Sequence, residues 1–298
     1  MSYELLFRPR AGALDRKHVK NFFDLRMHYS VDDDDAWYRN EDTGTGFVLT
    51  MRAEAESVGA LNFKIGDFLP SFIGEEASQE LAAVVDALDL IVADSIEQDA
   101  QQRSFEPEKF LTDWHHRNEL AYQSRVNEAR SGPLFSLPRA ELDRAWRWNI
   151  ARDRRRTEHG ARRFVPRVMF FAIEGIARST ALWPDAIPAL LPRVDYLIIH
   201  RQVFAPRKFL LVKSDVAVVS WRQASLLIEA HSGGTDETGY LIAYDDPPRE
   251  VGDFVKALTP YRTSLPGIAT AAILDAEWVR KYATAPAQSA PAQPLAPP

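Results

Sequence analysis

Four consecutive aspartates followed by aromatic and acidic residues form the most unusual local group in the sequence. Its members are Asp32, Asp33, Asp34, Asp35, Trp37, Tyr38, Glu41 and Asp42. Carboxylates at this density could bind a cation, but the group lacks the alternating oxygen ligands and the glycine of an EF-hand loop. Tryptophan and tyrosine are frequent interface anchors, so the group could instead be an anionic surface that binds a partner protein. A third interpretation is a solvated turn between two strands.

Residues 144–167 form a second charged segment, with nine arginines against Asp153 and Glu158. Arginines interleaved with Trp146 and Trp148 could contact the phosphates and stacked bases of a nucleic acid. The residues that we assign to this alternative are Arg152, Arg154, Arg155 and Arg156.

The apolar residues of the same segment favour a different interpretation. Leu142, Trp146 and Ile150 are spaced four residues apart and share one face of a predicted helix, so Trp146 is expected to face the core. We therefore favour an exposed helix whose arginines form ion pairs with the acidic first part of the chain.

Motifs of familiar enzyme chemistry are missing from the sequence. There is no GxxxxGK[ST] loop, no GxGxxG between a strand and a helix, no HExxH and no GxSxG elbow. Glu174, Asp195, Lys213 and Asp215 could be arranged into a metal-dependent nuclease site, but a chain with 42 carboxylates permits many such sets. Cysteine is absent, which excludes disulfides and thiolate ligands. The sequence predicts no cofactor and no metal ion.

Charge is distributed unevenly along the 298 residues, whose net charge is −6. Residues 1–110 carry 22 acidic and 11 basic side chains, whereas the remainder carries 20 and 25. This asymmetry indicates two electrostatically different regions. No apolar stretch has the length of a membrane helix or a secretory signal, and the absence of cysteine fits a reducing compartment. We expect a cytoplasmic protein that does not bind membranes.

Hydrophobic periodicity predicts the elements of the first region. Strand patterns occur at residues 3–9, 28–31, 45–52 and 59–66. In the last of these, Leu61, Phe63 and Ile65 alternate with polar residues, as in a half-buried strand. Helices are predicted after the N-cap Asp15 and over residues 75–98. Helices that cover one face of a mostly antiparallel sheet are the expected packing.

The rest of the chain is predicted to contain further helices and a second set of strands. Helix patterns occur at residues 108–130, 139–159, 249–258 and 271–283. Strand patterns occur at residues 165–175, 194–204, 208–215 and 216–221, and residues 224–244 are predicted to form two strands around a glycine-rich turn.

Together these patterns predict an α+β fold with two mixed regions joined by a helical segment. Residues 1–104 are expected to form an acidic domain of order β-α-β-β-β-α, and residues 105–163 a helical connector that contains the basic helix. Residues 164–283 are expected to form a second α+β domain with a mixed sheet and short helices. Residues 284–298 are rich in proline and alanine and are predicted to be disordered, because they cannot bury enough apolar surface.

The leading functional hypothesis is a non-enzymatic, immunity- or antitoxin-like factor that neutralises or scaffolds another protein. Its acidic group at residues 32–42 would meet a basic partner, such as a nuclease toxin, by electrostatic complementarity. One alternative is a hydrolase or nuclease whose residues converge from distant parts of the chain. Another is nucleic-acid binding through the arginine-rich helix.

Overall fold

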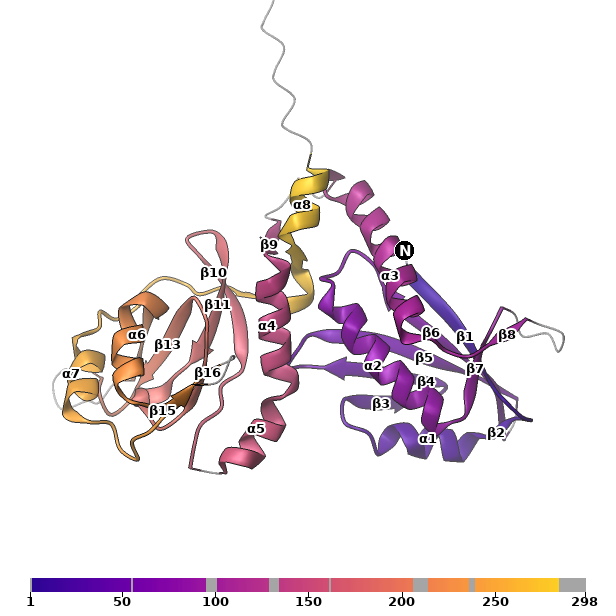
Figure 1. The fold of residues 1–298 in the computed structure, drawn as a ribbon, viewed down its shortest axis with the longest axis horizontal. Helices are drawn as coiled ribbons and strands as arrows, with labels where there is room; N and C mark the ends of the chain where they lie inside the picture. The colour runs from indigo at the N-terminus through magenta and orange to yellow at the C-terminus, as the bar shows by residue number, and fades with distance from the viewer. Residues whose placement is uncertain are drawn as a thin grey trace, which may run out of the picture.

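The computed structural model describes residues 2–54, 56–94, 101–128, 134–160, 162–205, 214–235 and 239–283. Within them the fold is α+β, as predicted, with one sheet-containing region on each side of a central helix, α4 (Arg139–Ile150) (Figure 1). The predicted disordered tail at 284–298 and most of the predicted strand at 208–215 lie outside the described residues. No helix in the described part of the chain combines the length and the apolar character needed to cross a bilayer.

The first region is an antiparallel sheet with strand order β3-β4-β5-β6-β1-β7-β8, and β2 pairs with β6. Its strands are β1 (Ser2–Pro9), β2 (Leu14–Asp15), β3 (Tyr29–Asp32), β4 (Asp35–Asn40), β5 (Thr45–Glu54), β6 (Ser57–Gly66), β7 (Leu90–Ala93) and β8 (Gln102–Arg103). The strands predicted in this part of the chain are confirmed. Leu61, Phe63 and Ile65 of β6 are fully buried, as their alternation indicated.

Two helices pack against this sheet. Helix α1 (Arg16–Asp24) begins as predicted, because the Asp15 carboxylate accepts a hydrogen bond of 2.7 Å from the His18 amide. Helix α2 (Phe72–Ala87) is shorter than predicted. The prediction that it continues to residue 98 is wrong, because Asp89 adopts a positive φ of 46° and the buried run that follows forms β7 beside β1.

Three helices form the segment between the two sheets: α3 (Pro107–Arg125), α4 and α5 (Arg152–His159), with β9 (Phe135–Leu137) before α4. Helix α4 is buried on two sides. Trp146 Nε1 donates 2.9 Å to Glu76 in the first region, and Trp148 Nε1 donates 2.8 Å to the Pro166 carbonyl on the other side. Asn149 donates both to the Asp42 carbonyl and to the Val168 carbonyl, and so bridges the two regions.

The second region contains a mixed sheet of order β14-β13-β11-β10-β17 and a smaller sheet of order β12-β16-β15. The strands are β10 (Val168–Ile173), β11 (Ile176–Leu182), β12 (Leu190–Pro192), β13 (Tyr196–Arg201), β14 (Asp215–Ser220), β15 (Ser232–Thr235), β16 (Gly239–Ile242) and β17 (Gly267–Ile268). The helices are α6 (Trp221–Ala230), α7 (Arg249–Ala257) and the single turns η2 (Pro184–Ala186) and η3 (Thr270–Ala272). The predicted strand at the start of residues 224–244 is wrong: a capping box between Ser220 and Gln223 starts α6 there.

The chain finally returns to the helical segment and to the start of α2 in the first region. Strand β18 (Ile273–Asp275) pairs in parallel with β9, and helix α8 (Ala276–Tyr282) packs on α3, as Figure 1 shows. Ser71, just before α2, donates both its amide (3.0 Å) and its hydroxyl (2.6 Å) to the Asp275 carboxylate. Residues 273–282 therefore connect back to elements more than 130 positions earlier in the sequence.

Candidate functional site

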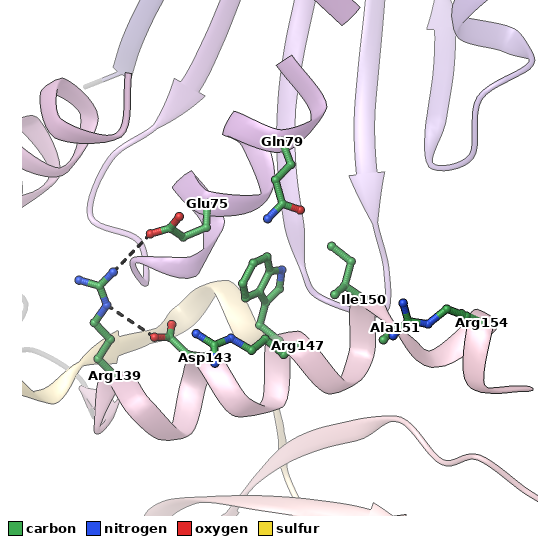
Figure 2. Close-up of a pocket in the computed structure, with 9 residues that line it drawn as sticks. Glu75, Gln79, Arg139, Asp143, Arg147, Ile150, Ala151 and Arg154 are labelled. Carbon is green, nitrogen blue, oxygen red and sulfur yellow. Dashed lines mark hydrogen bonds and ion pairs between the residues drawn. The ribbon is translucent and has the colours of Figure 1, made fainter. Parts of the chain in front are cut away.

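A groove of about 760 Å³ lies between α2 and the α4–α5 pair, and we call it the α2–α4 groove (Figure 2). Its lining residues are Glu75, Gln79, Arg139, Asp143, Trp146, Arg147, Ile150, Ala151 and Arg154. A second hollow of about 360 Å³ shares Ile150 with it and extends towards Met27, His28 and Tyr38. The first region and the helical segment therefore form the two walls of one open site.

The groove is supported from beneath by the buried carboxylate of Glu76, which is 1% exposed. Its Oε1 accepts hydrogen bonds from Tyr38 (2.8 Å), Asn40 (2.8 Å) and Thr43 (3.1 Å). Its Oε2 accepts from Thr45 (2.8 Å) and Trp146 (2.9 Å). Burial and the neighbouring Glu76 carboxylate raise the pKa of Tyr38, so its hydroxyl remains a donor. Five neutral donors thus hold one carboxylate and fix α4 against β4 and β5.

One end of the groove carries a cluster of paired charges. Arg139 lies 3.4 Å from Glu75 and 3.7 Å from Asp143, and His115 lies 3.7 Å from the same Glu75 oxygen. The neighbouring His115, together with Arg139 and Arg147, lowers the pKa of Glu75. Burial raises the pKa of Asp143. The positive charge of Arg139 is therefore largely neutralised by Glu75 and Asp143.

Two exposed guanidinium groups line the rest of the groove, with Arg147 near Asp143 and Arg154 at the opposite end (Figure 2). Arg147 forms no ion pair or hydrogen bond with the part of the chain that the structure describes. Arg154 lies 3.6 Å from Glu158, but both side chains are more than half exposed. Figure 2 shows Arg147 and Arg154 on either side of Ile150. These two arginines are available to an incoming anion.

Exposed apolar side chains adjoin the arginines. Met27 is 65% exposed and Ile150 41% exposed, although both line the second hollow. Leu25, in the same loop between α1 and β3, is 88% exposed. His28 in this loop has a φ of 68°, a left-handed conformation that is strained for a residue with a Cβ. The loop thus presents apolar groups beside the groove at some conformational cost.

The four consecutive aspartates lie at the hairpin between β3 and β4. Asp32 and Asp33 are exposed, whereas Asp34 pairs with Arg16 at 2.5 Å and Asp35 accepts 2.6 Å from Thr50. This end of the hairpin is one strand length, roughly 17 Å, away from the turn that follows β4.

The other predicted partner-binding residues are mostly engaged within the protein. Tyr38 is buried in the Glu76 network, and Trp37 is half-buried with the Arg39 guanidinium 5.0 Å from its ring. Asp42 accepts two hydrogen bonds, of 2.8 and 3.0 Å, from Arg152, while the Glu41 side chain is exposed. The structure therefore does not bring the predicted acidic group together on one surface.

The arginines predicted for nucleic-acid binding are divided in the same way. Arg152 pairs with Asp42, and Arg155 lies 4.4 Å from the Trp148 ring and donates to its carbonyl. Arg154 and Arg156 are exposed, and Arg156 pairs weakly with Asp153 at 3.4 Å.

The residues of the hypothetical metal-dependent nuclease site are engaged with different partners as well. Asp215 is bound by Arg201, Asp195 accepts from Ser179, and Lys213 lies outside the described residues. Among the residues that the structure describes, no group of three or more histidine and carboxylate side chains could hold a metal ion.

Sequence reasoning did not identify the groove. One signal was present: Arg139, Arg147 and Arg154 recur at intervals of eight and seven residues, which returns them to one side of the predicted helix. This spacing could not predict that Met27 lies near Ile150, because tertiary packing alone brings the two residues together. Comparison with protein-family models, with curated proteins and with solved structures finds no match for this chain.

A second site of interest is a half-buried carboxylate on the opposite side of α4. Glu141 faces a small cavity lined by Arg144, Trp148, Ser179 and Arg193. Burial, with the Asp195 carboxylate nearby, raises the pKa of Glu141. The folded protein therefore binds a proton at Glu141 more readily than the unfolded chain does, and this group lowers the free energy of unfolding as pH rises above roughly 4.

Glu141→Gln is expected to raise the melting temperature at pH 8, because glutamine resembles the protonated acid. The gain should shrink as pH falls and vanish below about pH 4, where the wild-type carboxyl becomes protonated in the unfolded as well as the folded state. Thermal unfolding followed by circular dichroism across this range measures the effect. Glu158→Gln, at an exposed position on α5, serves as the control for the removal of a glutamate charge and should change the melting temperature little. A Glu141→Gln variant less stable than wild type at pH 8 would contradict the prediction.

Proposed function

We propose that this chain is a protein-binding factor and that a segment of its partner lies in the α2–α4 groove and in the second hollow that adjoins it at Ile150. The observation that carries the proposal is that Met27 and Ile150, distant in sequence, line one cavity while 65% and 41% exposed. Apolar side chains exposed together in a concave site are typical of interface anchors. Exposed arginines beside them provide the polar rim that protein interfaces usually have.

The construction of the groove supports this proposal. The Glu76 network holds α4 at a fixed position against β4 and β5, so the groove exists before any partner binds. A preformed site avoids the entropic cost of ordering its walls on binding. The exposed Asp32 and Asp33 form a separate acidic hairpin, and their contact with a basic partner stays a prediction. The immunity- or antitoxin-like role and the cytoplasmic location stay predictions as well.

A photo-crosslinking amino acid at position 150 of the full chain tests this proposal in host cells. We expect a discrete protein adduct from position 150 and none from position 176, because Ile176 is a matched isoleucine, 52% exposed, on β11 of the second region. Once the adduct is identified, the purified partner is titrated against single variants. Ile150→Asp should weaken binding by at least about 30-fold, since losing a central anchor costs about 2 kcal/mol or more.

Ile176→Asp is the matched control and should change the affinity less than about twofold, as expected for an exposed side chain outside an interface. Equal crosslinking from positions 150 and 176, or an Ile150→Asp variant that binds the partner as wild type does, would remove the groove as the docking site.

A further inference from the structure

The charges of the α2–α4 groove are unevenly neutralised. Its lining contains two carboxylates, Glu75 and Asp143, and three guanidinium groups. Arg139 contacts both carboxylates, and His115 contacts Glu75 as well. Three guanidinium groups against two carboxylates leave the lining with a net positive charge. The groove therefore presents a positive surface, concentrated at Arg147 and Arg154.

The positions of these two arginines follow from the helices. Arg147 and Ile150 are three residues apart on α4, Arg154 lies on the following helix α5, and all three line the groove. An apolar side chain thus stands between two cations. Guanidinium groups bind carboxylates through paired, parallel hydrogen bonds, which makes such an arrangement selective as well as attractive.

We propose that the groove binds an acidic segment of a partner protein, with carboxylates on Arg147 and Arg154 and an apolar side chain on Ile150. This inference rests on the proposed function and specifies its partner. Gln79 on the facing wall, which is exposed, supplies an amide for the backbone of that segment. Met27 extends the apolar contact beyond Ile150.

A protein segment fits this arrangement better than a nucleic acid does. Sequence-tolerant nucleic-acid sites combine cations with aromatic rings on which bases stack. The aromatic ring in the groove is that of Trp146, which is only 8% exposed and uses its N–H on Glu76. The exposed side chain between the arginines is aliphatic, and phosphates gain nothing from contact with it.

Peptide display on the immobilised full chain tests this inference. The probe is a library of random 12-residue peptides, selected at 0.15 M salt on wild type and on the double variant Arg147→Glu/Arg154→Glu. We expect enrichment of aspartate and glutamate near an apolar residue on wild type, and loss of this enrichment on the double variant. Individual selected peptides should bind the double variant about 10- to 100-fold more weakly, the effect expected for charge-assisted hydrogen bonds.

Two further variants interpret the result. Arg222→Glu/Arg262→Glu, which reverses two exposed arginines of the second region, should leave peptide binding unchanged. If Ile150→Asp abolishes binding of the selected peptides but Arg147→Glu/Arg154→Glu does not, the acidic partner is wrong while the docking groove stands. If neither variant affects binding, the groove itself is wrong.

A nucleic acid is the remaining outcome. A fluorescent 20-base-pair DNA duplex is titrated against the same variants at the same salt concentration. Tight DNA binding that is lost in Arg147→Glu/Arg154→Glu, with no acidic enrichment among the peptides, would overturn the inference and assign the groove to nucleic acid.

Discussion

Glu76→Gln is expected to destabilise the protein by about 3 kcal/mol, although it replaces a carboxylate with an amide of the same shape. Glu76 accepts five hydrogen bonds, three at Oε1 and two at Oε2. The glutamine amide must place its NH₂ group at one of these two positions. One orientation sets it against the Asn40 NH₂ and the other against the Trp146 N–H. Both are donors without acceptor capacity, so neither orientation is satisfied.

Urea unfolding measures the effect, and Glu76→Ala should be destabilised at least as much, because it leaves all five donors without their acceptor. Glu80→Gln is the matched control on the same helix. Glu80 is 27% exposed and has one ion pair, with Arg26 at 2.9 Å, so its loss should cost less than about 1 kcal/mol. A Glu76→Gln variant within the range of this control would show that the network is not as tightly satisfied as its geometry indicates.

Arg201→Met is expected to cost about 3–5 kcal/mol, the range for removing one partner of a buried ion pair. Arg201 is fully buried in β13. Its Nε and Nη2 donate to the two Asp215 oxygens at 2.7 and 2.9 Å. Its Nη1 donates to the carbonyls of Val255 (2.9 Å) and Leu258 (2.8 Å) at the end of α7. Methionine fills the volume but leaves the carboxylate and both carbonyls without these donors.

Denaturant titration of three variants separates the contributions of Arg201. Arg201→Lys keeps the charge but cannot make the paired contact with Asp215, so it should restore less than half of the loss. Arg249→Met is the control, because Arg249 is 95% exposed and pairs with Asp253 only at 3.5 Å. Its effect should lie within about 0.5 kcal/mol of wild type. A loss for Arg201→Met as small as that of Arg249→Met would contradict the prediction.

The elements that were predicted correctly are those whose own residues decide their structure. Strand β6 shows a strict alternation of apolar and polar residues, and Asp15 is an N-cap that starts α1 from within one turn. The errors occur where an apolar run satisfies two patterns. Residues 90–93 continue the helical period of α2, but their place between β1 and β8 decides in favour of a strand.

The start of α6 was misassigned for the opposite reason. Its signal, Ser220 with Gln223 three residues later, was present in the sequence but lies just before the apolar run that suggested a strand. The candidate site was less accessible to prediction than the elements. The periodicity of α4 predicted one buried face, which contains Trp146. The burial of Trp148 on the other side follows only from the packing of the second sheet. A helix enclosed on two sides has no single apolar stripe to detect.

The pairing of β18 with β9 sets an order on biosynthesis. Strand β9 precedes α4, but its neighbour β18 is translated only after all the strands of the second sheet. In the nascent chain, β9 and one side of Tyr122 remain uncovered until Asp275 and α8 have been synthesised. A chain that terminates anywhere between these two strands therefore lacks the partner of β9. Its unpaired strand edge is a feature that protein quality control can recognise.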